Sequence, residues 1–314
     1  MPPTAGRYRR AVHGFSLSGI RTHDGPPLPY RAPARTVAAV PADATANGTA
    51  DGVAAAEPAS SGEPTRIGII GGTGPAGAAL ATRLADIGCE VTLGSRSKYR
   101  SMEVVDNILD RWPDRHLRIH PGANSLAAQE PTVVMATPWD AAAITARGVA
   151  EHLRGKVVAT MSNALARVDD EFVPLIPPRG SVAASVQASL PDSLVAAALQ
   201  HVPATELGNL DEPVHGDILI CSDHREATWH IAEIVDRMPG ARALDCGNLS
   251  NATAIEAFTA VLLQLNTRYR TRVALRLVGL DHVPISVLGG GPSRPEGQET
   301  ADVTAQRDAE TVPD

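Results

Sequence analysis

The segment that most constrains how this chain can fold runs from residue 67 to residue 100 and reads IGIIGGTGPAGAALATRLADIGCEVTLGSRSKYR. An apolar run leads into a glycine-rich turn, a helical pattern follows, and a second apolar run ends at Ser95 and Arg96. The turn from Gly72 to Gly77 has GxGxxG spacing directly after a predicted strand and directly before a predicted helix. In this context the spacing is typical of a dinucleotide site in a parallel sheet with helices on both faces.

Each glycine of the turn has a separate expected task. Gly72 makes the tight turn, Gly74 lets the backbone approach a pyrophosphate, and Gly77 lets the helix lie close to the strand. Pro75 occupies the first helical turn, where a missing N–H leaves no helical bond unmade. The free N–H groups there, together with the helix dipole, predict an anion site. The alternative is a glycine-rich turn without a ligand.

The end of the second strand predicts which dinucleotide binds. NAD-binding sites place Asp or Glu about 20 residues beyond the glycines, whereas this chain has Ser95 and Arg96. A carboxylate would repel a 2′-phosphate, but Arg96 offers a planar donor fork and a permanent positive charge. Arg100, one turn into the next helix, could close the same pocket. The pattern favours NADP over NAD; the alternative is that both arginines are ordinary solvated charges.

Apolar runs alternate with helical patterns from Arg66 onward, which predicts right-handed crossovers and a doubly wound parallel sheet. Strands are expected at Arg66–Gly71, Glu90–Gly94, Leu117–His120, Thr132–Ala136 and Lys156–Thr160, and helices at Pro75–Gly88, Ser97–Trp112, Ser125–Gln129 and Trp139–Leu153. Thr137, Pro138 and Trp139 follow the fourth strand. Ligands of such sheets bind outside the carboxyl ends of the strands, so this turn should border the nicotinamide half of the cofactor. A helix start with a packing aromatic is the alternative.

After residue 160 the pattern becomes irregular and rich in proline. A helix is expected near Ser181–Leu190, strands near 193–200, 217–222 and 242–245, and a helix near 224–238. The longest helical pattern begins near Thr253 and Glu256, which have capping-box spacing. That helix is expected to pack across its own domain or, alternatively, also against a second subunit.

The two ends of the chain differ from the middle in composition. Residues 1–65 hold nine of the 25 prolines and are expected to form a disordered extension. Residues 281–314 carry seven acidic and two basic residues, which is −5 of the formal −7, and are expected to be an acidic disordered tail. The nearly neutral remainder argues against a nucleic-acid partner. No stretch reaches the roughly 18 to 20 apolar residues of a membrane span. Three widely spaced cysteines without a CxxC pair fit a reducing cytoplasm.

No hydrolytic motif and no acidic cluster with metal-ligand spacing are present in the sequence. Hydride transfer between two organic cofactors needs no protein nucleophile; it needs donor and acceptor carbons held close, with water excluded. Val202, Ala204 and Leu249 would suit a slot for two stacked rings. His201 ends an apolar run and could line the site, although a structural histidine is an equal alternative.

Four segments together resemble the NADPH-dependent coenzyme F420 reductases: IGIIGGTGPAGAALATRLADIGCEVTLGSR, TPWDAA, ALQHVPATELGNLDEP and LDCGNLSNATAIEAFTAVLLQLN. The similarity covers about Arg66 to Leu280 in order. It implies an α/β fold with a Rossmann-type NADP domain over residues 66–188. A small C-terminal α+β domain over residues 189–280 would end in the long helix, help to hold the 5-deazaflavin and form a homodimer. The implied reaction is direct hydride transfer between NADP(H) and coenzyme F420.

The resemblance also implies site residues. Besides the glycines Gly72, Gly74 and Gly77, they are Thr73, Pro75 and Ala76 at the pyrophosphate, Ser95, Arg96 and Arg100 at the 2′-phosphate, Thr137, Pro138 and Trp139 along the dinucleotide, and Gln200, His201, Val202, Ala204, Asn248, Leu249 and Ser250 beside the rings. The chain departs from the family at Gln200, where His is frequent, and at Asn248, where Pro is frequent. Arg167, Arg179 and Arg268 are possible partners for the anionic side chain of the deazaflavin.

Two other functions stay open at this point. An NADP-dependent reductase of a small imine or carbonyl substrate would need a proton donor near the nicotinamide, and His201 is the best candidate. A non-catalytic NADP sensor would bind the cofactor tightly and pass its occupancy to a partner.

Overall fold

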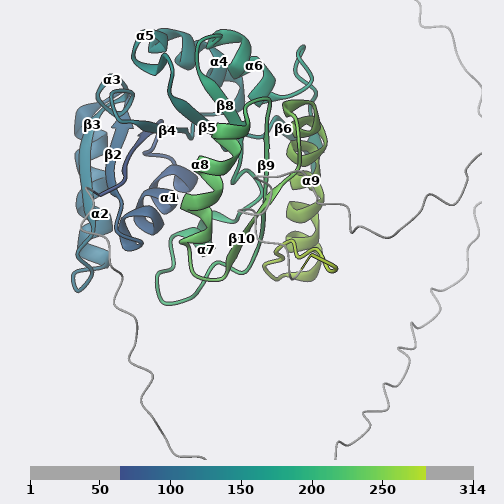
Figure 1. Cartoon of the computed structure of the whole chain (residues 1–314). Coiled ribbons are helices and arrows are strands. Elements are labelled where there is room, and N and C mark those ends of the chain that lie inside the picture. Colours follow the sequence, from purple (N-terminus) through teal and green to yellow (C-terminus); the bar gives the residue numbers. More distant parts are fainter. Residues whose placement is uncertain (1–63, 281–314) are drawn as a thin grey trace, which may run out of the picture. The chain divides into compact units, whose positions relative to one another are not determined.

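The computed structural model describes residues 64–280 (Figure 1). The predicted acidic tail and all but the last two residues of the predicted N-terminal extension lie outside this range. The first half alternates strands and helices as the sequence predicts. Its elements are β1 (Arg66–Ile70), α1 (Pro75–Asp86), β2 (Glu90–Ser95), α2 (Lys98–Arg111), β3 (Arg118–Ala123), α3 (Asn124–Ala127), β4 (Thr132–Met135), α4 (Trp139–Gly148), α5 (Ala150–Leu153) and β5 (Val157–Thr160).

The second half continues the same sheet. Its elements are the hairpin strands β6 (Leu165–Val168) and β7 (Glu171–Pro174), then α6 (Val182–Ser189), β8 (Leu194–Ala197), α7 (Ala204–Leu207), β9 (Gly216–Ser222), α8 (Arg225–Asp236), β10 (Ala241–Asp245), the 3₁₀ turn η1 (Leu249–Asn251) and α9 (Ala252–Tyr269). Figure 1 shows α9 beside the sheet, and it contacts the hairpin strand β7.

Eight strands form one sheet in the order β10-β9-β8-β5-β4-β1-β2-β3. Neighbouring strands are parallel except at β8 and β9, which are antiparallel. The fold is therefore a Rossmann-type α/β fold whose mostly parallel sheet carries flanking helices. The predicted domain boundary at residues 188 and 189 falls at the end of α6, and strands on both sides of it belong to this one sheet; the division into two domains stays a prediction.

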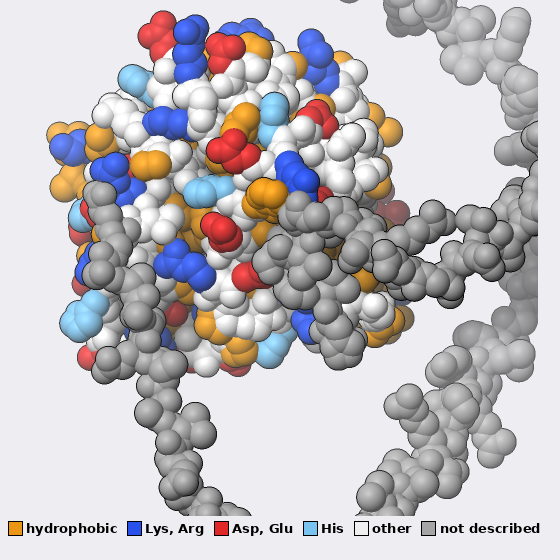
Figure 2. Space-filling view, viewed as in Figure 1, with side chains coloured by type: hydrophobic (Ala, Val, Ile, Leu, Met, Phe, Trp, Pro, Cys, Tyr) orange, Lys and Arg blue, Asp and Glu red, His pale blue; other side chains and the backbone are white. Residues whose placement is uncertain are grey.

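Burial explains why the strands carry continuous apolar runs. Every residue of β4 and β5 is buried, as expected of strands covered on both faces. Side chains of α1, α2 and α8 pack over one face, and those of α4 and α6 pack over the other. Gly77 is required where α1 crosses β1, because a Cβ atom there would lie 2.7 Å from the Cα of Gly72. On the surface in Figure 2, basic and acidic side chains are interspersed.

Three local predictions differ from the structure. The predicted helix 139–153 is interrupted at Val149, and the irregular stretch after β5 contains the β6–β7 hairpin. The predicted capping box at Thr253 and Glu256 is wrong. Glu256 is buried and accepts hydrogen bonds from the backbone N–H groups of Val182 (2.8 Å) and Ala183 (3.1 Å), so its carboxylate caps α6 and not its own helix. Capping-box spacing is a local pattern and does not reveal a partner 74 residues away.

Candidate dinucleotide-binding site

A pocket of about 720 Å³ lies outside the carboxyl ends of β1, β2 and β4, where doubly wound sheets bind their ligands. It brings together nine residues predicted from the sequence. They are Thr73, Gly74, Pro75, Ala76, Ser95, Arg96, Arg100, Thr137 and Pro138. These residues come from three separate turns, so the sheet assembles the pocket from segments that each follow a strand.

The glycine turn is fixed from two sides. The Gly72 N–H donates to the carbonyl of Gly94 at 2.9 Å, and the Gly71 N–H donates to Oδ1 of Asn124 at 3.0 Å. Gly71 has φ +73°, a conformation that favours glycine. Gly74 precedes α1 with an extended backbone, and its own carbonyl accepts the first helical bond from Ala78 at 2.9 Å. The first N–H groups of α1 are therefore available to an anion.

Ser95 and Arg96 stand at the end of β2 as expected for a 2′-phosphate site. Ser95 is buried, with its Oγ 3.4 Å from Oγ1 of Thr73 and 3.3 Å from the N–H of Ser97. Arg96 is exposed, and within residues 64–280 its guanidinium forms no hydrogen bond or ion pair. Arg100 is paired instead, at 2.8 Å, with Glu103. Arg96 is thus the arginine that is free to meet a phosphate, whereas Arg100 would have to leave its acid.

In the turn after β4, the hydroxyl of Thr137 is unpartnered among the described residues, and the carbonyl of Thr137 is held by a hydrogen bond. Thr137 is buried, and its Oγ1 has no hydrogen-bond partner among the described residues. Its carbonyl accepts a 2.6 Å bond from Oγ of Ser162. Pro138 precedes α4, and Trp139 packs against the core beside α4 and α6 instead of lining the pocket. The orphaned hydroxyl of Thr137 suits a polar group of a ligand.

Gln200 follows a strained residue at the end of β8. Leu199 has φ +66°, which is unusual for a residue with a side chain. Gln200 is 5% exposed, and both polar atoms of its amide lack a partner within the described chain. Its carbonyl accepts a 2.6 Å bond from the amide of Asn163, whose Oδ1 accepts a bond from Thr259 on α9. The end of β5, the end of β8 and α9 therefore meet at this point.

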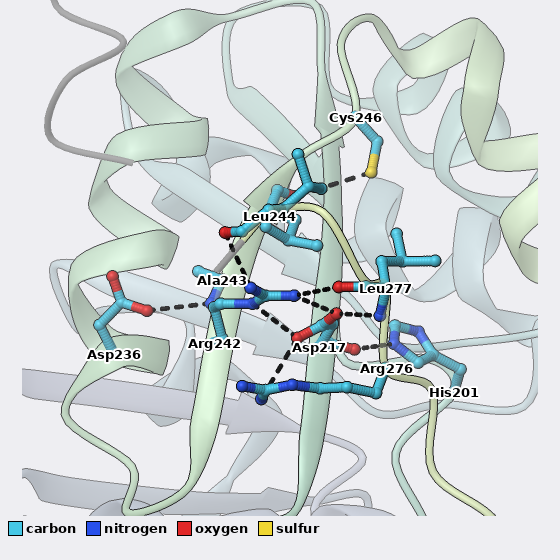
Figure 3. Close-up of polar contacts among 10 residues, drawn as sticks. His201, Asp217, Asp236, Arg242, Ala243, Leu244, Cys246, Arg276 and Leu277 are labelled. Atoms are coloured by element: carbon cyan, nitrogen blue, oxygen red, sulfur yellow. Dashed lines mark hydrogen bonds and ion pairs between the residues drawn. The ribbon is translucent and has the colours of Figure 1, made fainter. Parts of the chain in front are cut away.

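His201 points to a different part of the molecule. Its Nε2 lies 2.8 Å from the carbonyl oxygen of Asp217 on β9 (Figure 3). Burial lowers the pKa of His201, and the bond to Asp217 only partly opposes that shift. The imidazole is thus a neutral structural group, as the second of the two sequence interpretations has it. It does not line the dinucleotide pocket.

The structure does not bring Asn248, Leu249 and Ser250 to this pocket. Leu249 and Ser250 line a separate groove beside α6, and the N–H of Leu249 donates to Asp223 at 3.0 Å. The reason lies in the sheet: β9 runs antiparallel to β8, so the carboxyl ends of β9 and β10 lie at the edge opposite the glycine turn. Val202 packs against the core, and Ala204 begins α7 and lines another cleft beside α1.

Sequence reasoning missed several residues of the pocket. Asn124, Ser97, Ala141 and Thr145 line it in addition to the predicted set. Asn124 carried a usable signal, because it begins a short helix after the third strand, at the same edge as the glycine turn. Among the described residues, no group of His, Cys, Asp and Glu could hold a metal ion, and no helix is long and apolar enough to cross a membrane.

Comparison with known proteins gives consistent results. A family model described as "NADP oxidoreductase coenzyme F420-dependent" matches residues 66–164. The chain is 35% identical over 222 residues to the F420-dependent NADP reductase of Methanocaldococcus jannaschii, covering 69% of this chain and 99% of that one. It is 34% identical over 223 residues to the F420-dependent NADP reductase of Methanothermobacter marburgensis, with 68% and 99% covered. A crystal structure of a putative F420-dependent NADP-reductase from an Arthrobacter species superposes with a TM-score of 0.57 at 23% identity, covering 68% of this chain and 98% of that one, which supports the fold.

Proposed function

This chain belongs to the family of F420-dependent NADP reductases, and we propose that it transfers a hydride directly between NADP(H) and the 5-deazaflavin coenzyme F420. The observation that supports binding of NADP is that one pocket contains both the glycine turn and Arg96. Arg96 is exposed and forms no ion pair with an acid of the described chain. The deazaflavin half is supported by family membership. Together they give an oxidoreductase with two organic redox cofactors and no protein nucleophile.

Different residues of the pocket contact different parts of the dinucleotide in this proposal. We infer that the first N–H groups of α1, after Gly74, bind the pyrophosphate and that Ser95 and Arg96 bind the 2′-phosphate. The free hydroxyl of Thr137 supplies a polar contact nearer the nicotinamide, whereas Gln200, whose amide is also unpartnered within the described chain, does not line this pocket. When both cofactors are bound, their rings supply the hydride donor and acceptor. The protein contributes alignment and exclusion of water.

We also propose that the chain forms a homodimer through α9 and the β6–β7 hairpin. Phe258 and Val261 on α9 are 36% and 48% exposed, and Val168 and Val173 on the hairpin are exposed as well. Strand β7 contacts α9, so these side chains belong to one region of the surface. Light scattering should give twice the chain mass, and Val261→Asp should shift the protein toward the monomer. A monomer in the wild type at micromolar concentration would contradict the proposal.

A cytoplasmic location completes the proposal. It is supported by the thiols of Cys221 and Cys246, which shift each other's pKa and are both free of disulfide bonds. Such a pair would be at risk of oxidation outside a reducing compartment.

The function is tested by turnover with two pairs of cofactors. Purified protein with NADPH should bleach oxidised F420, while NADH in place of NADPH, or a common flavin in place of F420, should be turned over far more slowly. A protein that binds NADP tightly but exchanges no hydride with F420 would contradict the proposal and favour a sensor. Activity on an imine or carbonyl substrate would favour the other alternative, although the buried position of His201 removes the proton donor expected for it.

A further inference from the structure

Cys221 on β9 lies beside Cys246, which directly follows β10. The last residue pair of this parallel ladder is Ile220 beside Asp245, and the N–H of Cys246 donates to the carbonyl of Ile220 at 2.7 Å, which continues the pairing by one residue. Gly247, with φ +79°, then turns the chain away. Adjacent strands lie about 4.8 Å apart, and a disulfide needs a Cα separation of roughly 4.4 to 6.8 Å. The backbone therefore places the two cysteines at a separation that a disulfide can span.

Both cysteine side chains lie on the same face of the sheet. Cys221 belongs to an apolar cluster that also contains Leu244 of β10 and Ile255 of α9, and Cys246 packs against this cluster. Ile220, the neighbour of Cys221 along β9, belongs to a different core cluster, as expected where side chains alternate between two faces. The two thiols are close enough for each to shift the pKa of the other. Neither side chain has to change faces for the sulfur atoms to meet.

The two cysteines differ in their access to solvent. Cys221 is 0% exposed, whereas Cys246 is partly exposed and lies between the exposed residues Asp245 and Gly247. The interaction with the Cys221 thiol lowers the pKa of Cys246, and the same interaction, with burial, raises the pKa of Cys221. The thiolate is the nucleophilic form of cysteine. Cys246 is therefore the sulfur that an oxidant meets first, and Cys221 is the thiol held behind it.

Hydrogen bonds hold the turn after Cys246 in place. The N–H of Gly247 donates to Oδ1 of Asp245 at 2.8 Å, and the carbonyl of Gly247 accepts from the N–H of Ser222 at 3.0 Å. Nδ2 of Asn251 donates to the carbonyl of Cys246 at 2.7 Å. Because Cys246 is fixed relative to β9 on both sides, oxidation can join the two sulfur atoms without first rearranging the sheet.

We propose that Cys221 and Cys246 form a reversible redox site that reacts with hydroperoxides. The Cys246 thiolate attacks one oxygen of hydrogen peroxide, the O–O bond breaks, and the departing hydroxide takes up the thiol proton as water, which leaves Cys246 as a sulfenic acid. The Cys221 sulfur then attacks the Cys246 sulfur, the S–O bond breaks, and hydroxide leaves with the Cys221 proton as a second water. Two thiols are oxidised to one disulfide, and the peroxide is reduced to two waters. A dithiol restores both thiols by exchange and is itself oxidised to a disulfide.

This chemistry is separate from the dinucleotide pocket and goes beyond the proposed function. Neither cysteine lines that pocket, and the carboxyl ends of β9 and β10 lie at the edge opposite the glycine turn. Cys89 offers an internal comparison, because it is buried in a cluster that contains no second cysteine. The redox site can therefore be tested whether or not the protein turns over F420.

The experiment oxidises the full-length protein with hydrogen peroxide under native conditions and maps its cysteines by mass spectrometry without reduction. The peptides of Cys221 and Cys246 should appear joined, with the loss of two hydrogens, and dithiothreitol should separate them. The disulfide should form about tenfold faster than Cys89 is oxidised, since burial shields Cys89 and raises its pKa. At a fixed excess of peroxide the rate should not depend on protein concentration, because the bond forms within one chain.

Variants separate the roles of the two sulfur atoms. Cys221→Ser should stop the reaction at a sulfenic acid on Cys246, which dimedone traps, and Cys246→Ser should abolish both the disulfide and the fast reaction with peroxide. Cys89→Ser is the matched control and should form the disulfide as the wild type does. Thermal melts before oxidation check that all three variants fold.

The wild type alone can overturn the proposal, even if a variant folds poorly. Oxidation of Cys246 without a bond to Cys221 would show that the two sulfur atoms do not meet in the native sheet. A disulfide that joins two chains, or one that forms no faster than Cys89 is oxidised, would equally contradict a redox site within one chain.

Discussion

At the scale of single residues, Arg96 carries the choice between NADP and NAD. Its guanidinium is exposed and engages no acid within residues 64–280. We expect Arg96→Ser to weaken NADP by about 1 to 3 kcal/mol through the loss of charge-assisted hydrogen bonds, with little effect on NAD. Titration calorimetry with both dinucleotides measures this. Arg100→Ser is the comparison and should have the smaller effect, because Arg100 is already paired with Glu103. Equal losses for NADP and NAD in Arg96→Ser would show that Arg96 does not contact the 2′-phosphate.

The three cysteines should differ in how fast their thiols are alkylated. Cys221 lies on β9 and Cys246 directly follows β10, and the interaction with the Cys221 thiol lowers the pKa of Cys246. The same interaction, with burial, raises the pKa of Cys221, and burial raises the pKa of Cys89. Iodoacetamide at pH 8 should therefore label Cys246 first, as read by mass spectrometry of peptides. Rapid labelling that persists in Cys246→Ser would contradict this assignment.

The residue-level predictions that rest on a local signal agree with the geometry of the pocket, and the roles of these residues toward a cofactor stay predictions. Ser95 and Arg96 were found because the glycine spacing fixes where the second strand ends, and the structure places both in the pocket. Asn248 to Ser250 lie outside this pocket, and their position depends on the direction of β9 relative to β8. No pattern within either strand specifies that direction. Asn163 was missed for the same reason, since its partners are on β8 and α9.

At the scale of elements, the contact between α9 and α6 should make stability depend on pH. Burial raises the pKa of Glu256 to about 7, above the value of about 4.5 for a free glutamate, although bonds from Val182 and Ala183 oppose the shift. The native state then binds more protons than the unfolded state between these pH values, so stability falls as pH rises from about 4.5 to 7. The fall should be at most about 3 kcal/mol.

Glu256→Gln tests this directly. The amide keeps an oxygen for the N–H groups of α6 but does not titrate, so urea unfolding at pH 5 and pH 7.5 should show a smaller difference than in the wild type. Glu233→Gln on the surface of α8 is the control and should leave the pH dependence as it was. A wild type whose stability rises over this range would show that the bonds from Val182 and Ala183 outweigh burial.

The position of the loop after α7 depends on hydrogen bonds from the buried Arg83. Arg83→Met should destabilise the protein by about 3 kcal/mol or more, because it strands several carbonyls that the guanidinium now satisfies. Arg83→Lys should recover only part of the loss, since an ammonium cannot reach all the same acceptors. Thermal unfolding gives the comparison. A loss below about 0.5 kcal/mol for Arg83→Met would mean that water replaces these bonds at little cost.

At the scale of the whole molecule, the sequence predicted the layers better than their connections. Strand and helix positions followed from apolar runs and their period, because strands buried on both faces of a sheet need continuous runs of apolar residues. The continuation of the sheet through β8, β9 and β10 was not predicted; a separate small domain was expected instead. That residues 189–280 form a domain of their own stays a prediction. The homodimer also stays a proposal, because it depends on apolar side chains of α9 and the β6–β7 hairpin that are exposed in a single chain.

The buried Asp217 has a consequence for the end of the described chain. Its carboxylate receives two bonds from Arg242, an ion pair from Arg276 and the N–H of Leu277, and Figure 3 shows these groups converging. Burial alone would raise the pKa of Asp217, but these bonds outweigh it and lower the pKa. In deuterium exchange, the Leu277 amide should be protected well beyond that of Val278, and Asp217→Asn should remove the difference. The last residues before position 280 would then open together with the sheet, on the timescale of global unfolding, and not as a fraying terminus.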